Sequence, residues 1–446
     1  MFRINNLEFN MKKKLIKYTL FITSISFFCF LGINFAQQSI PDFVNTSHLD
    51  HLFQKINVNG REMGFLYFNS TYPDYKYADN PGVGIANVSD ASQGIIFYIK
   101  YYEHKKDSSI INKIKMLTNF LLYMQDDNGF FNNYIWENYS KDISNQMSIA
   151  APNMWSWKAI FALGEAYNFF KKEDPEYSER ILKPLQISVS NTRKWLIKNK
   201  SDSTQNFGGF RLPTWLPNNT NADQAAMIVK GFLSYYSATH DTLIKLQIIH
   251  LCGGIKGMQA GTGREFPYYG YLTNMNNWQQ DDQYQAEAML NAGKLFNISD
   301  YISSAQKEIW DFYPYLIKGG YLYKTSVNLL PDTSVLIDSV KYPQLPSGIL
   351  PFVSASVIAY NYAKDMGSAS VAGLLANWFL GQNAAGMSLY NYKTGICFNK
   401  IVNETDIDKN SGAQATINAL QTFLEIDKVP LAKRIVWNYI QNHPSN

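Results

Sequence analysis

Apolar residues recur at helical spacing along the chain from about residue 85 to its end. From Ile110 to Gln125, for example, they stand at positions 110, 114, 117, 121 and 124, which is one face of a helix. The same pattern predicts twelve helical stretches, which begin at or near residues 90, 110, 152, 178, 222, 241, 282, 300, 351, 368, 411 and 430.

Alternate helices of this set differ in composition. The odd-numbered ones carry few charges and many small residues, as in "ADQAAM", "QAEAMLNAG", "SASVIA" and "SGAQAT", which is typical of helices surrounded by protein. Several even-numbered ones are amphipathic in the ordinary way. The odd helices also start about 60 to 70 residues apart, a near-constant period that indicates an array of helical hairpins. We therefore predict an all-α fold, an (α/α)6 barrel of six inner and six outer helices in which the first hairpin meets the last.

The connections between helices fall into two classes. Those from an inner to an outer helix, such as "EHKKDSS" and "FNISD", are short and polar. Those from an outer to an inner helix are long and combine glycine with aromatic residues, as in "QDDNGFFNNYIW" and "GREFPYYGYLTNMNNW". The long connections should form short β-hairpins and gather at one end of the barrel, together with the N-termini of the inner helices. A binding cleft is expected at that end.

The chain begins with a segment unlike the rest. Residues 1–36 have a basic start, an apolar run and a small residue at Ala36, which is the layout of a secretory signal peptide, and Met11 is a second candidate start. The alternative is that the apolar run stays in place as an anchor. Residues 37–85 are predicted as an irregular lead-in with short strands around "GREMGFLYFNS", and residues 86–446 as the barrel. We expect a secreted or periplasmic protein.

Composition excludes several classes of function. Residues 1–36 contain five Lys or Arg and one Glu, so the formal net charge of +4 falls to about zero without them and leaves no basic stripe for nucleic acid. No Cys or His cluster has metal-ligand spacing, and no cofactor is expected. No apolar stretch after residue 36 is long enough to span a membrane. Cys252 and Cys397 can form one disulfide or remain two buried thiols, and the oligomeric state is left open.

Carboxylates collect at the end where the cleft is expected. Glycoside hydrolysis needs two carboxyl groups, one protonated and one ionised. A helix N-terminus favours the ionised form, which makes Asp90, Asp223 and Asp282 candidates for the base or nucleophile; each can equally be an ordinary helix cap. Asp281 precedes Asp282 in "QQDDQ", and two adjacent acids are more than one cap requires. Glu137 lies between Trp136 and Tyr139, a setting that should favour the protonated form of a general acid.

Aromatic residues on the long connections are candidates for stacking on sugar rings. The chain contains 30 Tyr, 28 Phe and 9 Trp, so many of these rings must also be core. Arg211 in "GFRLPTW" can hold an acidic sugar or brace its loop. The candidate substrate-binding residues are Trp136, Arg211, Trp215, Tyr268, Tyr269, Trp278 and Tyr390.

The segments just described resemble the six-hairpin glycosidase superfamily over residues 85–440. Residues 378–420, "WFLGQNAAGMSLYNYKTGICFNKIVNETDIDKNSGAQATINAL", are similar to the last hairpin of bacterial proteins with a "WFLGxN…GxxLYxxxTGxCxxG…NxGAEST" pattern. The resemblance implies an (α/α)6 barrel and a glycoside hydrolase that acts through acidic residues. Gln414 stands in "GAQAT" where those proteins have Glu, and glutamine cannot ionise.

Three functions therefore remain. The first is an exported glycoside hydrolase that cleaves an oligo- or polysaccharide with a pair of carboxylates. The second is a polysaccharide lyase on the same barrel, for which Arg211 and His240 would have to supply the neutralising and basic groups. The third is a glycan-binding protein without catalysis, which Gln414 favours.

Overall fold

The computed structural model describes residues 40–78, 82–198, 203–330 and 333–444. The predicted signal peptide lies outside them. The fold below is that of the compact unit Asp42–Asn446.

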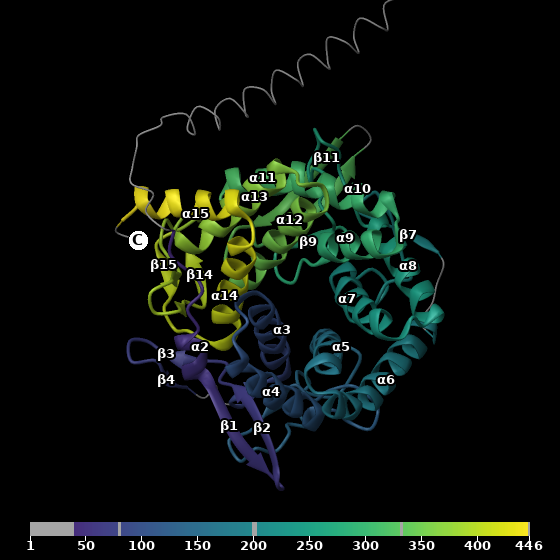
Figure 1. Ribbon diagram of the computed structural model, residues 1–446. Helices are drawn as coiled ribbons and strands as arrows, with labels where there is room; N and C mark the ends of the chain where they lie inside the picture. Colours follow the sequence, from purple (N-terminus) through teal and green to yellow (C-terminus); the bar gives the residue numbers. More distant parts are fainter. Residues whose placement is uncertain (1–39, 79–81, 199–202, 331–332, 445–446) are drawn as a thin grey trace, which may run out of the picture. The chain divides into compact units, whose positions relative to one another are not determined.

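Six helical hairpins make up most of this unit, and their helices appear in chain order around a ring in Figure 1. The inner helices are α3 (Val88–Lys105), α5 (Met154–Glu173), α7 (Ala222–Thr239), α9 (Gln285–Phe296), α12 (Leu350–Ala363) and α14 (Ala413–Asp427). The outer helices are α4 (Ile111–Met124), α6 (Pro175–Lys198), α8 (Thr242–Gly257), α10 (Ser299–Lys307), α13 (Met366–Ala376) and α15 (Pro430–Asn442). After α10 the chain continues through the π-helical turn η2 (Glu308–Phe312) into α11 (Tyr313–Gly319).

The inner helices form a closed ring. Each packs against the next, from α3 through α5, α7, α9, α12 and α14, and α14 packs back against α3. Small residues allow this close approach: a Cβ added at Gly164 of α5 would lie 2.8 Å from the Ser234 hydroxyl oxygen on α7, and one at Gly231 of α7 would lie 3.1 Å from Ile160. The predicted (α/α)6 barrel is confirmed.

Ion pairs close the ring between the first and last inner helices. Lys100 Nζ lies 2.8 Å from Glu425 Oε1, and His104 Nε2 lies 2.7 Å from Asp427 Oδ2. Lys105 also pairs with Asp427, at 2.9 Å. These residues belong to α3 and α14, so the charges that α3 carries along this face are matched by the last hairpin.

The strands lie before the barrel and in the long connections. The lead-in contains α2 (Ser47–Leu52), the antiparallel hairpin β1 (Phe53–Val58) and β2 (Arg61–Leu66), and the short pair β3 (Ser70–Thr71) and β4 (Lys76–Tyr77). It joins the barrel where the backbones of Ser70 and Ser411 exchange two hydrogen bonds of 3.0 Å. Gly412 follows, and a Cβ there would lie only 1.9 Å from the Phe68 carbonyl oxygen.

Every long connection from an outer to an inner helix contains strands, as predicted. In chain order they are β5 (Ala86–Asn87) paired with β6 (Tyr134–Ile135), β7 (Thr204–Phe207) with β8 (Phe210–Pro213), the sheet of β9 (Asn277–Gln279), β10 (Lys324–Leu330) and β11 (Thr333–Val340), β12 (Tyr390–Asn391) with β13 (Ile396–Cys397), and β14 (Lys400–Asn403) with β15 (Asp406–Asp408). Short 3-10 turns complete the chain at η1 (Ser108–Ile110), η3 (Pro346–Gly348) and η4 (Asn377–Leu380).

Two further features bear on the sequence predictions. Cys252 and Cys397 are both buried free thiols, so they do not form a disulfide in this structure. Across the described residues, none of the helices combines the length and the apolar character that a membrane span requires.

Candidate functional site

The barrel axis holds a cavity of about 20 Å³, large enough for one water molecule. It is lined by polar and apolar residues from the N-terminal halves and middles of the inner helices. The lining residues are Ser92, Gln93, Ile96, Lys158, Phe161, Met227, Lys230, Tyr284, Leu350 and Gln421. The space at the centre is therefore narrow, and a larger ligand has to lie above it, at the rim formed by the long connections.

An ion pair marks this rim. Lys158 on α5 places its Nζ 2.8 Å from Oδ2 of Asp282, which lies just before α9. The two side chains are only 6% and 13% exposed. Burial alone would lower the pKa of Lys158, but the charges of Asp282 and Asp281 raise it above its ordinary value. Asp282 has a φ of 54°, in the left-handed region, which aspartate adopts more readily than most residues other than glycine.

Asp223 and Asp281 share this site. The pKa of Asp223 is raised to about 7, mainly by burial and also by the charges of Asp282 and Asp281, against hydrogen bonds from backbone N–H groups. Burial also raises the pKa of Asp281 to about 6, with Asp282 adding to the effect. Within the described protein, the Oδ1 atoms of Asp223, Asp281 and Asp282 are buried and have no hydrogen-bond partner. Buried polar atoms in native proteins are nearly always paired, so these three oxygens point to a polar ligand or water.

Asp90 completes the group on α3. Asn87, the N-cap residue, accepts a hydrogen bond from the Asp90 backbone N–H at 2.7 Å and donates one from its amide to Asp90 Oδ2 at 2.8 Å. Burial nevertheless raises the pKa of Asp90 to about 6, although Asn87 and Lys158 act in the opposite direction. The pKa of Asp90 and that of Asp223 are thus raised in spite of the helix N-terminus, because loss of hydration outweighs the helix dipole at both positions, although Asp90 remains mostly ionised at neutral pH.

Glu137 does not have the surroundings expected of a general acid. It is exposed, in a turn that runs from Trp136 to Ser140 and is closed by the Trp136 N–H donating to the Ser140 carbonyl at 2.9 Å. The neighbouring ring of Trp136 is half-buried. Among the acids predicted for the site, Asp223 is therefore the carboxyl best suited to carry a proton near neutral pH.

Two of the predicted stacking residues are core side chains. Trp278 is 0% exposed and packs edge to face on Phe312, with ring centroids 5.2 Å apart. Tyr390 is 2% exposed and donates a hydrogen bond to the Phe43 carbonyl at 2.8 Å. Neither ring has a free face for a sugar in this structure, because each fills space beneath a long connection.

The other predicted binding residues lie on the long connections. Trp215, Tyr268 and Tyr269 are half-buried, and Trp215 donates to the His250 carbonyl at 3.3 Å. Arg211 is exposed on β8 and donates from Nε to the hydroxyl of Thr204 on β7 at 2.5 Å, so it braces this hairpin. The structure does not bring these four residues into the lining of the axial cavity.

The sequence analysis missed the lysines inside the barrel. Lys230 on α7 pairs with Glu287 on α9 at 2.8 Å and lies 3.9 Å from the centre of the Tyr284 ring. Burial lowers the pKa of Lys230, whereas Glu287 raises it. A signal was present, since Lys158 and Lys230 are charged residues within otherwise sheltered helices, and such a residue needs a buried partner. Among the described residues, no group of His, Cys, Asp or Glu side chains could hold a metal ion.

Comparison with known proteins identifies the fold. No family model and no curated protein matches the sequence. Solved structures do match. A sugar epimerase from a ruminal bacterium has a TM-score of 0.58 and 11% identity, over 88% of this chain and 97% of that one. Cellobiose 2-epimerase from Spirochaeta thermophila DSM 6192 has a TM-score of 0.56 and 11% identity, over 82% of this chain and 91% of that one, and D-mannose isomerase has a TM-score of 0.54 and 14% identity, over 88% and 100%. At such low identity the likeness concerns the fold alone. Together with the closed ring of six helical hairpins, these structures identify the fold of this chain as an (α/α)6 barrel.

Proposed function

We propose that this protein is a carbohydrate-active enzyme that hydrolyses glycosidic bonds at the rim of its barrel. The observation that carries the proposal is the pairing of unlike carboxyl groups. Asp223, with a pKa of about 7, retains a proton near neutral pH, whereas Asp282 is ion-paired with Lys158. Two titratable groups whose environments drive them to different protonation states are the arrangement that acid–base hydrolysis requires.

In this mechanism Asp223 is the general acid and gives its proton to the oxygen that leaves the sugar. Asp282 is the carboxylate that either activates a water molecule or attacks the sugar carbon. Lys158 holds Asp282 in place and balances its charge. The unpartnered Oδ1 atoms of the two carboxyl groups are available for these contacts.

A second candidate is a sugar epimerase or isomerase, because the structures compared above carry those names. Such a reaction removes a proton next to a carbonyl group, most often with histidine as the base. All six histidines fall within the described ranges, and none of them is among the groups that act on the pKa of Asp90, Asp223 or Asp281. Carboxylates would then have to act as the bases, and we therefore rank hydrolysis first.

The test is an assay of the purified chain on a panel of glycans. Hydrolysis should release reducing ends, and both Asp223→Asn and Asp282→Asn should reduce the rate by roughly 10²–10⁴-fold, the usual contribution of general acid–base groups. Asp127→Asn is the matched control, since Asp127 is an exposed carboxylate on another connection at this end, and it should leave the rate unchanged.

Other products would contradict the proposal in distinct ways. Deuterium incorporation from heavy water into an intact sugar would identify an epimerase or isomerase. An unsaturated product that absorbs in the ultraviolet would identify a lyase, and binding without turnover would identify a glycan-binding protein. Export is a separate proposal. It predicts that the secreted protein begins after Ala36, which N-terminal sequencing would test.

A further inference from the structure

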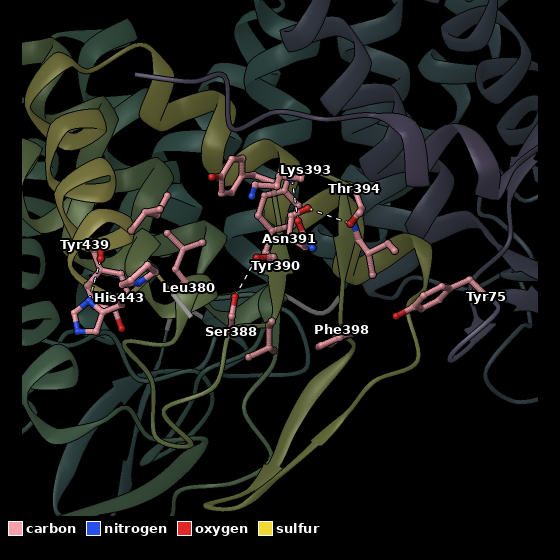
Figure 2. Close-up of a pocket in the computed structure, with 15 residues that line it drawn as sticks. Tyr75, Leu380, Ser388, Tyr390, Asn391, Lys393, Thr394, Phe398, Tyr439 and His443 are labelled. Carbon is pink, nitrogen blue, oxygen red and sulfur yellow. Dashed lines mark hydrogen bonds between the residues drawn. The ribbon is translucent and has the colours of Figure 1, made fainter. Parts of the chain in front are cut away.

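A second cavity of about 390 Å³ lies at the same end of the barrel but outside the ring (Figure 2). It is formed by the connection from α13 to α14 and by the end of α15. Outer helices finish, and inner helices begin, at the end that carries the acids, so the topology places this cavity and the acid group on one rim. The cavity shares no lining residue with the axial cavity.

The lining combines rings with free hydroxyl groups. Tyr75, Tyr392 and Tyr439 are half-buried, and among the described residues none of their hydroxyls has a hydrogen-bond partner. In Figure 2, Tyr75 lies on the far side of the cavity from Tyr439 and His443. His443 covers one face of the Tyr439 ring, with centroids 4.2 Å apart.

This chemistry fits a sugar unit. Ligand pockets typically measure roughly 300–1,000 Å³, which includes this cavity. An aromatic ring offers the apolar face that a pyranose covers, and the phenol groups at the edge can exchange hydrogen bonds with its hydroxyls. Among the described residues, no carboxylate lines the cavity, whereas Lys393 does, so both neutral and acidic sugars are compatible with the charge of this lining.

A row of aromatic side chains in contact with one another, here called the file of rings, runs from the cavity towards the acids. Tyr75 packs edge to face on His48, with centroids 5.3 Å apart, and His48 stacks on His51 at 5.8 Å. His51 stacks on Tyr77 at 5.1 Å, and Tyr77 stacks on Tyr67 at 3.9 Å.

The file ends beside the acid group. Tyr67 forms a β-bridge with Ala86, and the next residue, Asn87, holds Asp90. Tyr77 is 44% exposed, so part of the file is open to solvent. His48 is only 5% exposed, so a chain that runs between the two places would touch the file of rings at Tyr77.

We propose that the cavity around Tyr75 and Tyr392 is a distal subsite for a glycan chain whose reacting unit lies at Asp223 and Asp282. This inference rests on the proposed function and extends it, since it assigns the substrate to long oligosaccharides or polysaccharides. Short substrates occupy the acid group alone. Long ones gain additional affinity from the distal subsite.

The test measures binding, so that it does not depend on turnover. Asp223→Asn serves as the parent, and Tyr75→Ala and Tyr392→Ala are made in it. Tyr362→Ala is the control, because Tyr362 is 48% exposed near the C-terminal end of α12, at the opposite end of the barrel. Calorimetric titrations use short and long cello-, xylo- and manno-oligosaccharides and oligogalacturonides.

The two subsite variants should lose roughly ten-fold in affinity for long oligosaccharides, as expected for one lost ring contact. Their affinity for short oligosaccharides should equal that of the parent. The control variant should bind both short and long oligosaccharides as tightly as the parent does. Equal losses on short and long ligands, or no loss, would overturn the subsite even if the enzyme proves to be a hydrolase. A loss confined to long ligands in a protein without hydrolytic activity would keep the subsite and reject the proposed reaction.

Discussion

Replacing Asp223 by asparagine should abolish the proposed acid and at the same time stabilise the fold at alkaline pH. Burial raises the pKa of Asp223 from 3.8 to about 7. A raised pKa in the folded state means that folding favours the protonated carboxyl. The resulting stabilisation is complete below about pH 4 and is lost as the pH rises through about 7. Above that range the folded protein contains an ionised carboxylate in an unfavourable place.

The size of the effect follows from the shift in pKa. Each pKa unit corresponds to about 1.4 kcal/mol of folding free energy, so a shift of about three units contributes at most about 4 kcal/mol. The contribution is smaller than this limit because part of Asp223 is exposed to solvent. Asparagine has nearly the same shape and cannot ionise. Asp223→Asn should therefore match the parent at about pH 4 and exceed its free energy of unfolding by up to about 4 kcal/mol at about pH 8.

Urea unfolding followed by circular dichroism at both pH values measures this difference. The other buried acids titrate in both proteins and largely cancel in the comparison. Asp127→Asn, at an exposed position, should show no such pH dependence. A gain of equal size at both pH values, or a parent more stable at pH 8, would show that burial does not raise this pKa and would remove the basis for its role as the acid.

Three further substitutions test the frame around the site. Lys158→Met leaves Asp282 as a buried unpaired charge, and should lower the free energy of unfolding by about 3–5 kcal/mol and abolish activity, as checked by denaturant titration and the glycan assay. Glu425→Gln removes a buried carboxylate. Burial alone would raise the pKa of Glu425, but its lysine partner on α3 lowers it to about 2. The free energy of unfolding should therefore fall by about 3 kcal/mol at neutral pH, and this difference from the parent should shrink as the pH falls from about 4.5 towards 2. Gly412→Ala puts a methyl group 1.9 Å from the Phe68 carbonyl and should cost roughly 1–3 kcal/mol, seen as a lower melting temperature; an unchanged melting temperature would contradict this close contact.

The helices could be predicted because their signals are local. The inner helices begin at residues 88, 154, 222, 285, 350 and 413, each within about three residues of the start predicted from small and apolar runs. The fourth outer hairpin helix runs further than predicted, since η2 and α11 extend it to Gly319. The pairing of the first and last hairpins followed from the number of repeats, and the structure confirms it.

The site was less predictable, because burial at the rim depends on how the long connections fold over one another. Asp223, Asp281 and Asp282 lie together, and burial raises the pKa of Asp223, whereas its helix position alone predicts an ionised carboxylate. A sequence shows which residues lie at the start of a helix, but it does not show how much water a side chain loses when the long connections fold over it. Trp278 shows the same limit, since a tryptophan on a long connection gives no sign that it packs on Phe312.

The contact between α3 and α14 has a consequence for how the chain matures. In an open solenoid each added repeat finds its neighbour already folded, and a missing terminal repeat merely shortens the array. Here Lys100 and His104 contact Glu425 and Asp427, which follow more than three hundred residues downstream. A nascent polypeptide therefore leaves the charge of Lys100 and the adjoining apolar surface of α3 uncovered until α14 emerges. Premature stop codons before Ala413, which remove α14, should therefore yield aggregating or degraded fragments instead of smaller working rings.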